Sequence, residues 1–75
     1  MEEKQKKFLR ALIDCGASFE TLLAVGMVIK TEASRKLMAK MILDEVDRGA
    51  QANDELIKKV FVQIMMASEM DANDK

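Results

Sequence analysis

The sequence predicts an all-α fold, a small bundle of three or four helices that forms a dimer, and three observations support this prediction. The chain of 75 residues contains no proline and seven methionines, a composition that favours helices. Large apolar side chains recur every three or four residues, which is typical of helices with one buried side. Opposite charges recur four residues apart, as in Glu2 with Lys6 and Glu55 with Lys59, and such pairs stabilise helices. Residues 1–75 are predicted to form one domain.

The first helix is predicted over residues 2–15. Four apolar side chains in this segment lie at helical spacing and form one stripe: Phe8, Leu9, Leu12 and Ile13. Gly16 follows directly and accepts the left-handed backbone conformation that ends many helices. We therefore expect this helix to end at Gly16 with its stripe facing the core.

The second helix is predicted over residues 19–30, with Ser18 as its N-cap and Glu20 in its first turn. Its second half is apolar on every side, so we expect it to be buried on most sides. A strand over residues 22–31 is the alternative, but no second strand is available to pair with it. Gly26 is unfavourable inside a helix and marks either a close helix crossing or a turn.

The third helix is predicted over residues 32–48, because Thr31 can cap its start and Gly49 can end it. Its apolar side chains form one face: Leu37, Met38, Met41, Ile42 and Val46. No proline separates this helix from the second one, so the two could also fuse into one helix of roughly 45 Å.

The last helix is predicted over residues 54–70, followed by a polar tail at 71–75 that we expect to fray. Its apolar side chains do not keep to one stripe. One broad face carries Leu56, Ile57, Val60, Phe61, Ile64 and Met65, and the other side carries Val62, Met66 and Met70. A small bundle covers only one face of each helix well, so the second face needs cover from another molecule.

This two-sided character of the last helix predicts self-association. A chain this short usually needs additional stabilisation from a disulfide, a metal or a partner, and a single cysteine provides no internal disulfide. We expect a homodimer whose interface includes Val62, Met66, Met70, Leu56 and Phe61. Two other interpretations stay open: the last helix is the central helix of a compact bundle, or its second face binds a different protein.

Enzymatic function is not expected. The chain lacks histidine, tyrosine and tryptophan, and its three glycines are isolated, so no phosphate-binding loop is present. Cys15 lies near a helix C-terminus, where the helix dipole disfavours a thiolate. The acids Asp44, Glu45 and Asp47 are interpreted as a solvated, salt-bridged surface. We expect no cofactor and no metal.

Nucleic-acid binding is the alternative function. Residues 18–37 could form a helix, a turn at Gly26 and a second helix that carries Arg35, Lys36 and Lys40. Against this, the apolar run continues through the proposed turn, and the net charge of the chain is −1. A basic helical face is more often a solvated surface than a recognition surface.

The function that the sequence favours is therefore that of a non-enzymatic, helical protein–protein interaction module, a homodimer that acts as a regulatory or inhibitory protein. The longest apolar run is far too short to span a membrane, and no targeting segment is recognised. One unpaired cysteine is typical of a cytoplasmic protein. No motif in the sequence identifies the partner.

Overall fold

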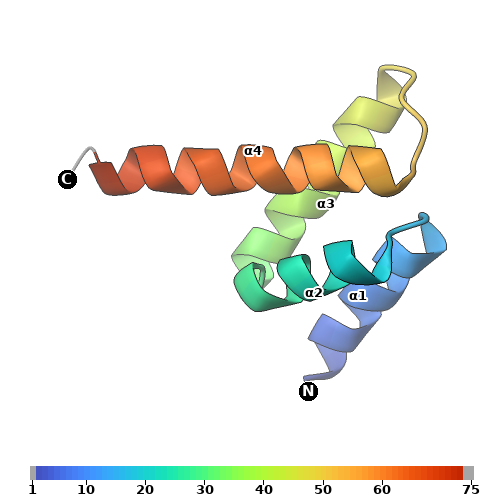
Figure 1. The fold of residues 1–75 in the computed structure, drawn as a ribbon, viewed down its shortest axis with the longest axis horizontal. Coiled ribbons are helices and arrows are strands. Elements are labelled where there is room, and N and C mark those ends of the chain that lie inside the picture. The colour runs from blue at the N-terminus through green and yellow to red at the C-terminus, as the bar shows by residue number, and fades with distance from the viewer. Residues whose placement is uncertain (1, 74–75) are drawn as a thin grey trace.

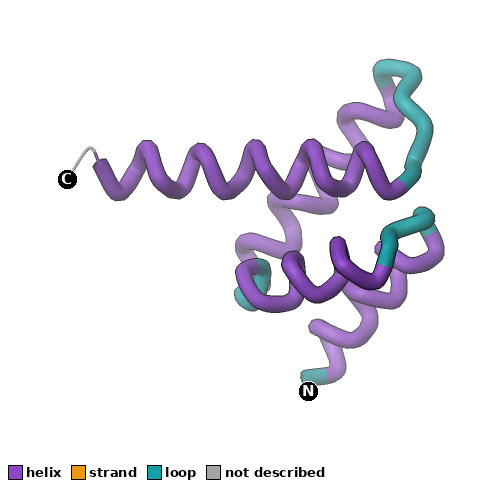
Figure 2. Tube along the Cα trace, viewed as in Figure 1, coloured by secondary structure: helices purple, strands orange, loops and turns teal. Residues whose placement is uncertain are grey.

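The computed structural model describes the backbone of residues 2–73 and the side chains of residues 2–67. Over this range it contains four helices and no strand: α1 (Glu3–Asp14), α2 (Phe19–Val28), α3 (Glu32–Asp47) and α4 (Asp54–Asn73). Figure 2 shows the helices joined by short loops. The prediction of a small all-helical bundle is confirmed.

The helices form two layers in a flat molecule that measures 37 × 33 × 20 Å. In Figure 1, α2 and α4 lie in the front layer and run in the same direction, while α1 lies behind α2 and α3 crosses behind α4. α4 packs against α3 and α2, and α1 packs against α2. Two layers of helices, each about 10 Å across, account for the short dimension.

Glycine ends both α1 and α3, as the sequence predicts. Gly16 and Gly49 have φ angles of 99° and 105°, in the left-handed region that other residues rarely adopt. After α1, the N–H of Ala17 donates to the carbonyl of Leu12 at 3.0 Å. After α3, the N–H of Ala50 donates in the same way to Glu45 at 3.0 Å. These bonds satisfy carbonyls that the helix ends would otherwise leave unpaired.

A break at residues 29–31 separates α2 from α3, so the two helices are not fused. Thr31 caps α3: its Oγ1 accepts a hydrogen bond from the Ser34 N–H at 3.1 Å, and Ser34 Oγ accepts one from the Thr31 N–H at 3.1 Å. Gly26 lies inside α2, so the expected alternatives of a strand or a turn there are wrong. A Cβ on Gly26 would lie 3.8 Å from Leu9 Cδ1, so α1 and α2 cross closely at this residue.

The start of α4 is tied to the start of α2. Asn53 Oδ1 accepts a hydrogen bond from the Leu56 N–H at 2.9 Å, which caps α4. Asp54 Oδ1 accepts one from the Ser18 N–H at 2.7 Å. These contacts hold α2 beside α4. At its other end α4 continues to Asn73, past the predicted end at residue 70, and residues 74 and 75 lie outside the described residues.

The core lies between the two layers and receives side chains from every helix. Half of its buried apolar residues belong to α4, which contacts both α2 and α3. The buried apolar side chains are Leu12, Val25, Ile29, Met38, Ile42, Leu56, Ile57, Val60, Phe61 and Ile64.

A buried polar cluster joins α1 to the α2–α3 turn. Gln5 donates from Nε2 to the Ile29 carbonyl at 2.8 Å and accepts at Oε1 from Arg35 Nη1 at 2.7 Å. The same Arg35 nitrogen donates to the Lys30 carbonyl at 2.9 Å. Glu2 Oε1 lies 3.8 Å from Arg35 Nη2. In the described part of the chain, every buried side-chain nitrogen and oxygen has a hydrogen-bond partner.

Candidate protein interface

A stripe of large apolar side chains lies exposed along α2. Phe19, Leu23 and Met27 follow one another at intervals of four residues, and their exposed fractions are 73%, 52% and 72%. At 100° per residue they lie opposite Thr21 and Val25, which α2 buries in the core. Our expectation that this all-round apolar helix is buried on most sides is therefore wrong. Exposed apolar side chains in a continuous row are typical of an interaction surface.

α4 also exposes apolar side chains on the side that points away from its core contacts. Val62 and Met66, which the sequence places in the interface, have exposed fractions of 50% and 59%. They lie roughly opposite Ile57 and Ile64, which are buried. Met70, the third residue expected on this side, lies outside the described side chains.

Leu56 and Phe61 lie in the core and not on the exposed side of α4. Both are buried among the apolar residues that α2, α3 and α4 share. The reason is their direction on the helix, since Leu56 and Phe61 flank Ile57 and Val60 on the buried face. The five residues expected in the interface therefore divide into two in the core, two at the surface and one outside the described side chains.

The exposed stripes of α2 and α4 belong to two helices that contact each other. Both helices form the front layer in Figure 1, and both pack against helices of the rear layer. We give the name apolar face to five of the large apolar residues that these two helices expose: Phe19, Leu23, Met27, Val62 and Met66.

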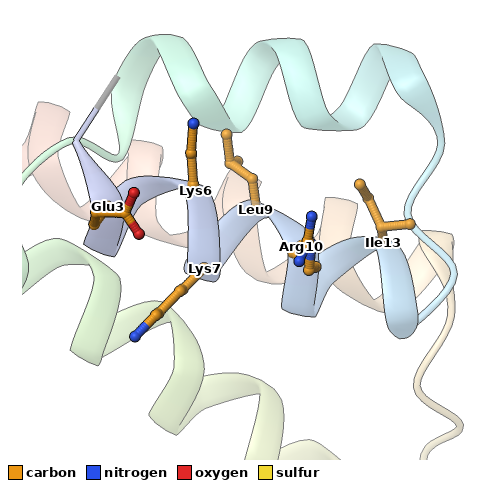
Figure 3. A pocket seen from close by; sticks show the side chains of 6 residues that line it. All are labelled: Glu3, Lys6, Lys7, Leu9, Arg10 and Ile13. Atoms are coloured by element: carbon orange, nitrogen blue, oxygen red, sulfur yellow. The ribbon is translucent and has the colours of Figure 1, made fainter.

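A shallow groove of about 520 Å³ runs along α1, beside α2. Figure 3 shows Lys6, Leu9 and Ile13 on the side of α1 that is turned toward α2, and Lys7 on the side turned toward α3. We call Lys6, Lys7 and Arg10 the basic edge. All three are exposed, and none forms an ion pair within 4.0 Å among the described residues.

An acidic edge lies at the junction of α3 and α4. It consists of Asp44 and Asp47 near the end of α3 and Glu55 in the first turn of α4, all exposed. None of the three is in an ion pair within 4.0 Å in the described part of the chain. Residues 1–40 contain eight basic and five acidic residues, whereas residues 41–75 contain four and eight. The two parts of the sequence therefore carry net charges of opposite sign, although the net charge of the chain is only −1.

Two other acids near this junction are held in structural contacts. Glu45 hydrogen-bonds to Lys59 Nζ at 3.0 Å and to Arg48 at 2.9 Å, and the Lys59 contact lowers the pKa of the Glu45 carboxyl. The Ser18 N–H lowers the pKa of Asp54 to about 2, assisted by the Thr21 hydroxyl. Both carboxylates fix helices in place, so they are not free for a partner.

Acid is expected to destabilise the fold through Asp54. The pKa of this carboxyl is 3.8 when unperturbed and about 2 in the folded chain, so its stabilising contribution is complete above about pH 4 and disappears as the pH falls to about 2. Thermal unfolding of the wild type and Asp54→Asn, followed by circular dichroism from pH 6 to 2, measures this. Between pH 6 and pH 2, the stability of Asp54→Asn should fall less than that of the wild type, whereas the stability of Glu55→Gln should fall as much as that of the wild type. Equal slopes in all three proteins would contradict this role of Asp54.

The basic residues of α3 that we considered for nucleic-acid binding do not act as one surface. Arg35 is only 8% exposed, and the buried polar cluster occupies its guanidinium. Lys36 and Lys40 are exposed, and Lys36 lies 3.7 Å from Glu32. Of the proposed three-residue contact surface, only Lys36 and Lys40 remain, one helical turn apart on α3.

Cys15 is half-buried at the C-terminal end of α1, where the sequence placed it. Within the described residues, no group of three or more acids or cysteine could hold a metal ion. None of the helices in this range is both long and apolar enough to cross a membrane.

Comparison of the chain with protein-family models, with curated protein sequences and with solved structures finds no match.

Proposed function

We propose that this chain is a non-enzymatic protein–protein interaction module that forms a homodimer through its apolar face and acts as a regulatory or inhibitory protein. The observation that supports this most is the exposed row of Phe19, Leu23 and Met27 on α2. Val62 and Met66 are exposed on α4, the helix that packs beside α2. Aromatic residues and methionine are enriched in protein interfaces.

A broad side of this molecule is large enough for a dimer interface. A specific interface buries about 800 Å² on each partner, and the total accessible surface of this chain is 5513 Å². One broad side of a molecule of 37 × 33 Å offers on the order of 1,000 Å², which is enough. Covering this side would also shield the apolar stripe of α2 from water, which is the main favourable contribution to association.

Leu23→Glu is expected to dissociate the dimer, because it places a charge in the middle of the apolar face. Size-exclusion chromatography with light scattering at about 100 μM should give twice the chain mass for the wild type and the chain mass of 8.4 kDa for the variant. Met66→Glu tests the α4 part of the face in the same way. Circular dichroism should show that both variants remain helical.

Leu43→Glu is the matched control. Leu43 is 63% exposed but lies on α3, outside the apolar face, among charged residues. This variant should remain a dimer. A wild type that is monomeric at this concentration, or a Leu43→Glu variant that dissociates as completely as Leu23→Glu, would overturn the proposal.

A further inference from the structure

A second groove lies between α1 and α3, the two helices that carry no residue of the apolar face. It has a volume of about 370 Å³, and both helices contribute to its lining. Figure 3 shows Lys7 on the side of α1 that is turned toward α3. We call this site the α1–α3 groove. Its lining includes Lys4, Lys7 and Phe8 of α1 and Glu32, Lys36 and Ala39 of α3.

The α1–α3 groove carries more positive than negative charge. Four of its lining residues are basic, whereas Glu32 is the one acid among the described residues that line it. The Oε1 atom of Glu32 lies 3.8 Å from Lys4 Nζ and 3.7 Å from Lys36 Nζ. Lys7 is exposed and forms no ion pair within 4.0 Å in the described part of the chain. One carboxylate cannot neutralise three exposed ammonium groups, so the groove attracts an anionic partner.

The same groove offers apolar side chains beside its lysines. Phe8 and Ala39 line it and are half-buried. Leu43 follows Ala39 by four residues, so it lies on the same side of α3, and 63% of its surface is exposed. From Glu32 to Leu43, this side of α3 is roughly 16 Å long, which is about three helical turns. A partner in the groove therefore meets cationic and apolar groups within this short length.

We propose that the α1–α3 groove binds an acidic amphipathic helix of another protein. Such a helix presents carboxylates and apolar side chains at intervals of three and four residues, which is also the spacing of Lys36, Ala39 and Leu43 on the wall of the groove. A nucleic-acid backbone would pair with the lysines but would leave Phe8 and Leu43 without an apolar contact. The acidic helix is the partner that uses both kinds of side chain.

This proposal does not depend on the dimer. The proposed homodimer forms through residues of α2 and α4, whereas the groove consists of residues of α1 and α3. One chain can therefore bind a second copy and an acidic helix through different helices. In the regulatory role proposed above, the acidic helix is the segment of the target protein that this chain recognises.

A designed peptide tests the groove. The probe is a fluorescein-labelled helical peptide of about 16 residues, slightly longer than three turns, with leucine at intervals of three and four residues, glutamate beside each leucine and alanine elsewhere. Fluorescence anisotropy at about 50 mM salt should give a dissociation constant below about 100 μM. A control peptide with glutamine in place of every glutamate should bind at least roughly tenfold more weakly. Binding of the acidic peptide should weaken at about 0.3 M salt, because salt screens the lysines.

Two neighbouring lysines of α1 provide the matched comparison. Lys7→Glu should weaken binding of the acidic peptide at least roughly tenfold, because it places a like charge in the groove. Lys6→Glu makes the same charge change on the side of α1 that is turned toward α2, so it should weaken binding less than about threefold. Leu43→Glu should also lose the peptide but remain a dimer, whereas Leu23→Glu should bind the peptide as a monomer. Circular dichroism establishes that each variant is helical.

Three results would overturn the proposal. They are no saturable binding of the acidic peptide up to about 1 mM, equal losses in Lys6→Glu and Lys7→Glu, and tighter Lys7-dependent binding of a DNA duplex of about 20 base pairs than of the peptide. The last result would make the groove a phosphate-binding site. A monomeric wild type that binds the peptide supports the groove and refutes the homodimer. A dimeric wild type that does not bind it refutes the groove alone.

Discussion

Arg35→Ala is expected to lower the free energy of unfolding by about 2–4 kcal/mol, because it leaves buried hydrogen-bond acceptors without donors. Arg35 Nη1 donates to Gln5 Oε1 at 2.7 Å and to the Lys30 carbonyl at 2.9 Å. Both acceptors would lose a charge-assisted hydrogen bond, and the contact with Gln5 is buried whereas that with Lys30 is partly buried. Urea denaturation followed by circular dichroism measures the change, at one fixed chain concentration since self-association raises apparent stability.

The adjacent Lys36 provides the control for Arg35. Lys36 is exposed, and its ion pair with Glu32 is long at 3.7 Å, so Lys36→Ala should change the free energy of unfolding by less than about 0.5 kcal/mol. The double variant Gln5→Leu with Arg35→Met removes both partners of the buried contact. It should be more stable than Arg35→Ala alone, because fewer polar atoms remain buried and unpaired. Equal losses in Arg35→Ala and Lys36→Ala would contradict the role of the cluster.

Local sequence signals were sufficient to predict where α2 and α3 begin and where α1 and α3 end, whereas α2 ends at Val28, two residues before the predicted end. Ser18 and Thr31 each cap a helix with a side-chain oxygen, and Gly16 and Gly49 each end one with positive φ. Such signals act within a few residues, so the local sequence alone reveals them. The end of α4 was predicted less well. No glycine or proline follows residue 70, and the polar tail that we expected to fray continues the helix to Asn73.

Contacts between distant residues could not be predicted in this way. Gln5 and Arg35 are 30 positions apart, and nothing in either local pattern indicates that they meet. Arg35 consequently resembled a basic surface residue when only the sequence was considered. The side of α2 that is exposed was also undetermined. When a helix is apolar on every side, its sequence pattern does not indicate which side is buried, because the neighbouring helices determine this.

The last helix shows what a two-sided apolar pattern can and cannot indicate. Its pattern predicted a buried face and a second apolar face, and the structure buries Ile57 and Val60 while exposing Val62 and Met66. Leu56 and Phe61 lie at the margins of the buried face, where a helical projection alone does not separate core from surface. Whether such marginal residues are buried depends on where α2 and α3 pack.

Ile57→Ala is expected to lower the free energy of unfolding by about 2–5 kcal/mol, because the truncated side chain leaves a cavity in the core. Ile57 is fully buried on α4, the helix that contacts both α2 and α3. Urea denaturation measures this loss, at a chain concentration low enough for the proposed dimer to be dissociated. If Ile57→Ala fails to fold, Ile57→Val gives the same test with an expected loss of about 0.5–1.5 kcal/mol.

Val62→Ala is the matched control for Ile57→Ala, since Val62 lies on the same helix but on its exposed side. It should change the free energy of unfolding of the monomer by less than about 0.5 kcal/mol, and in the proposed dimer it should instead weaken association. Monomer stability thus reports on the buried face of α4 through Ile57→Ala, and association reports on its exposed face through Val62→Ala. Equal destabilisation of the monomer by Val62→Ala and Ile57→Ala would mean that α4 is buried on both sides, and the apolar face would then be confined to Phe19, Leu23 and Met27 on α2.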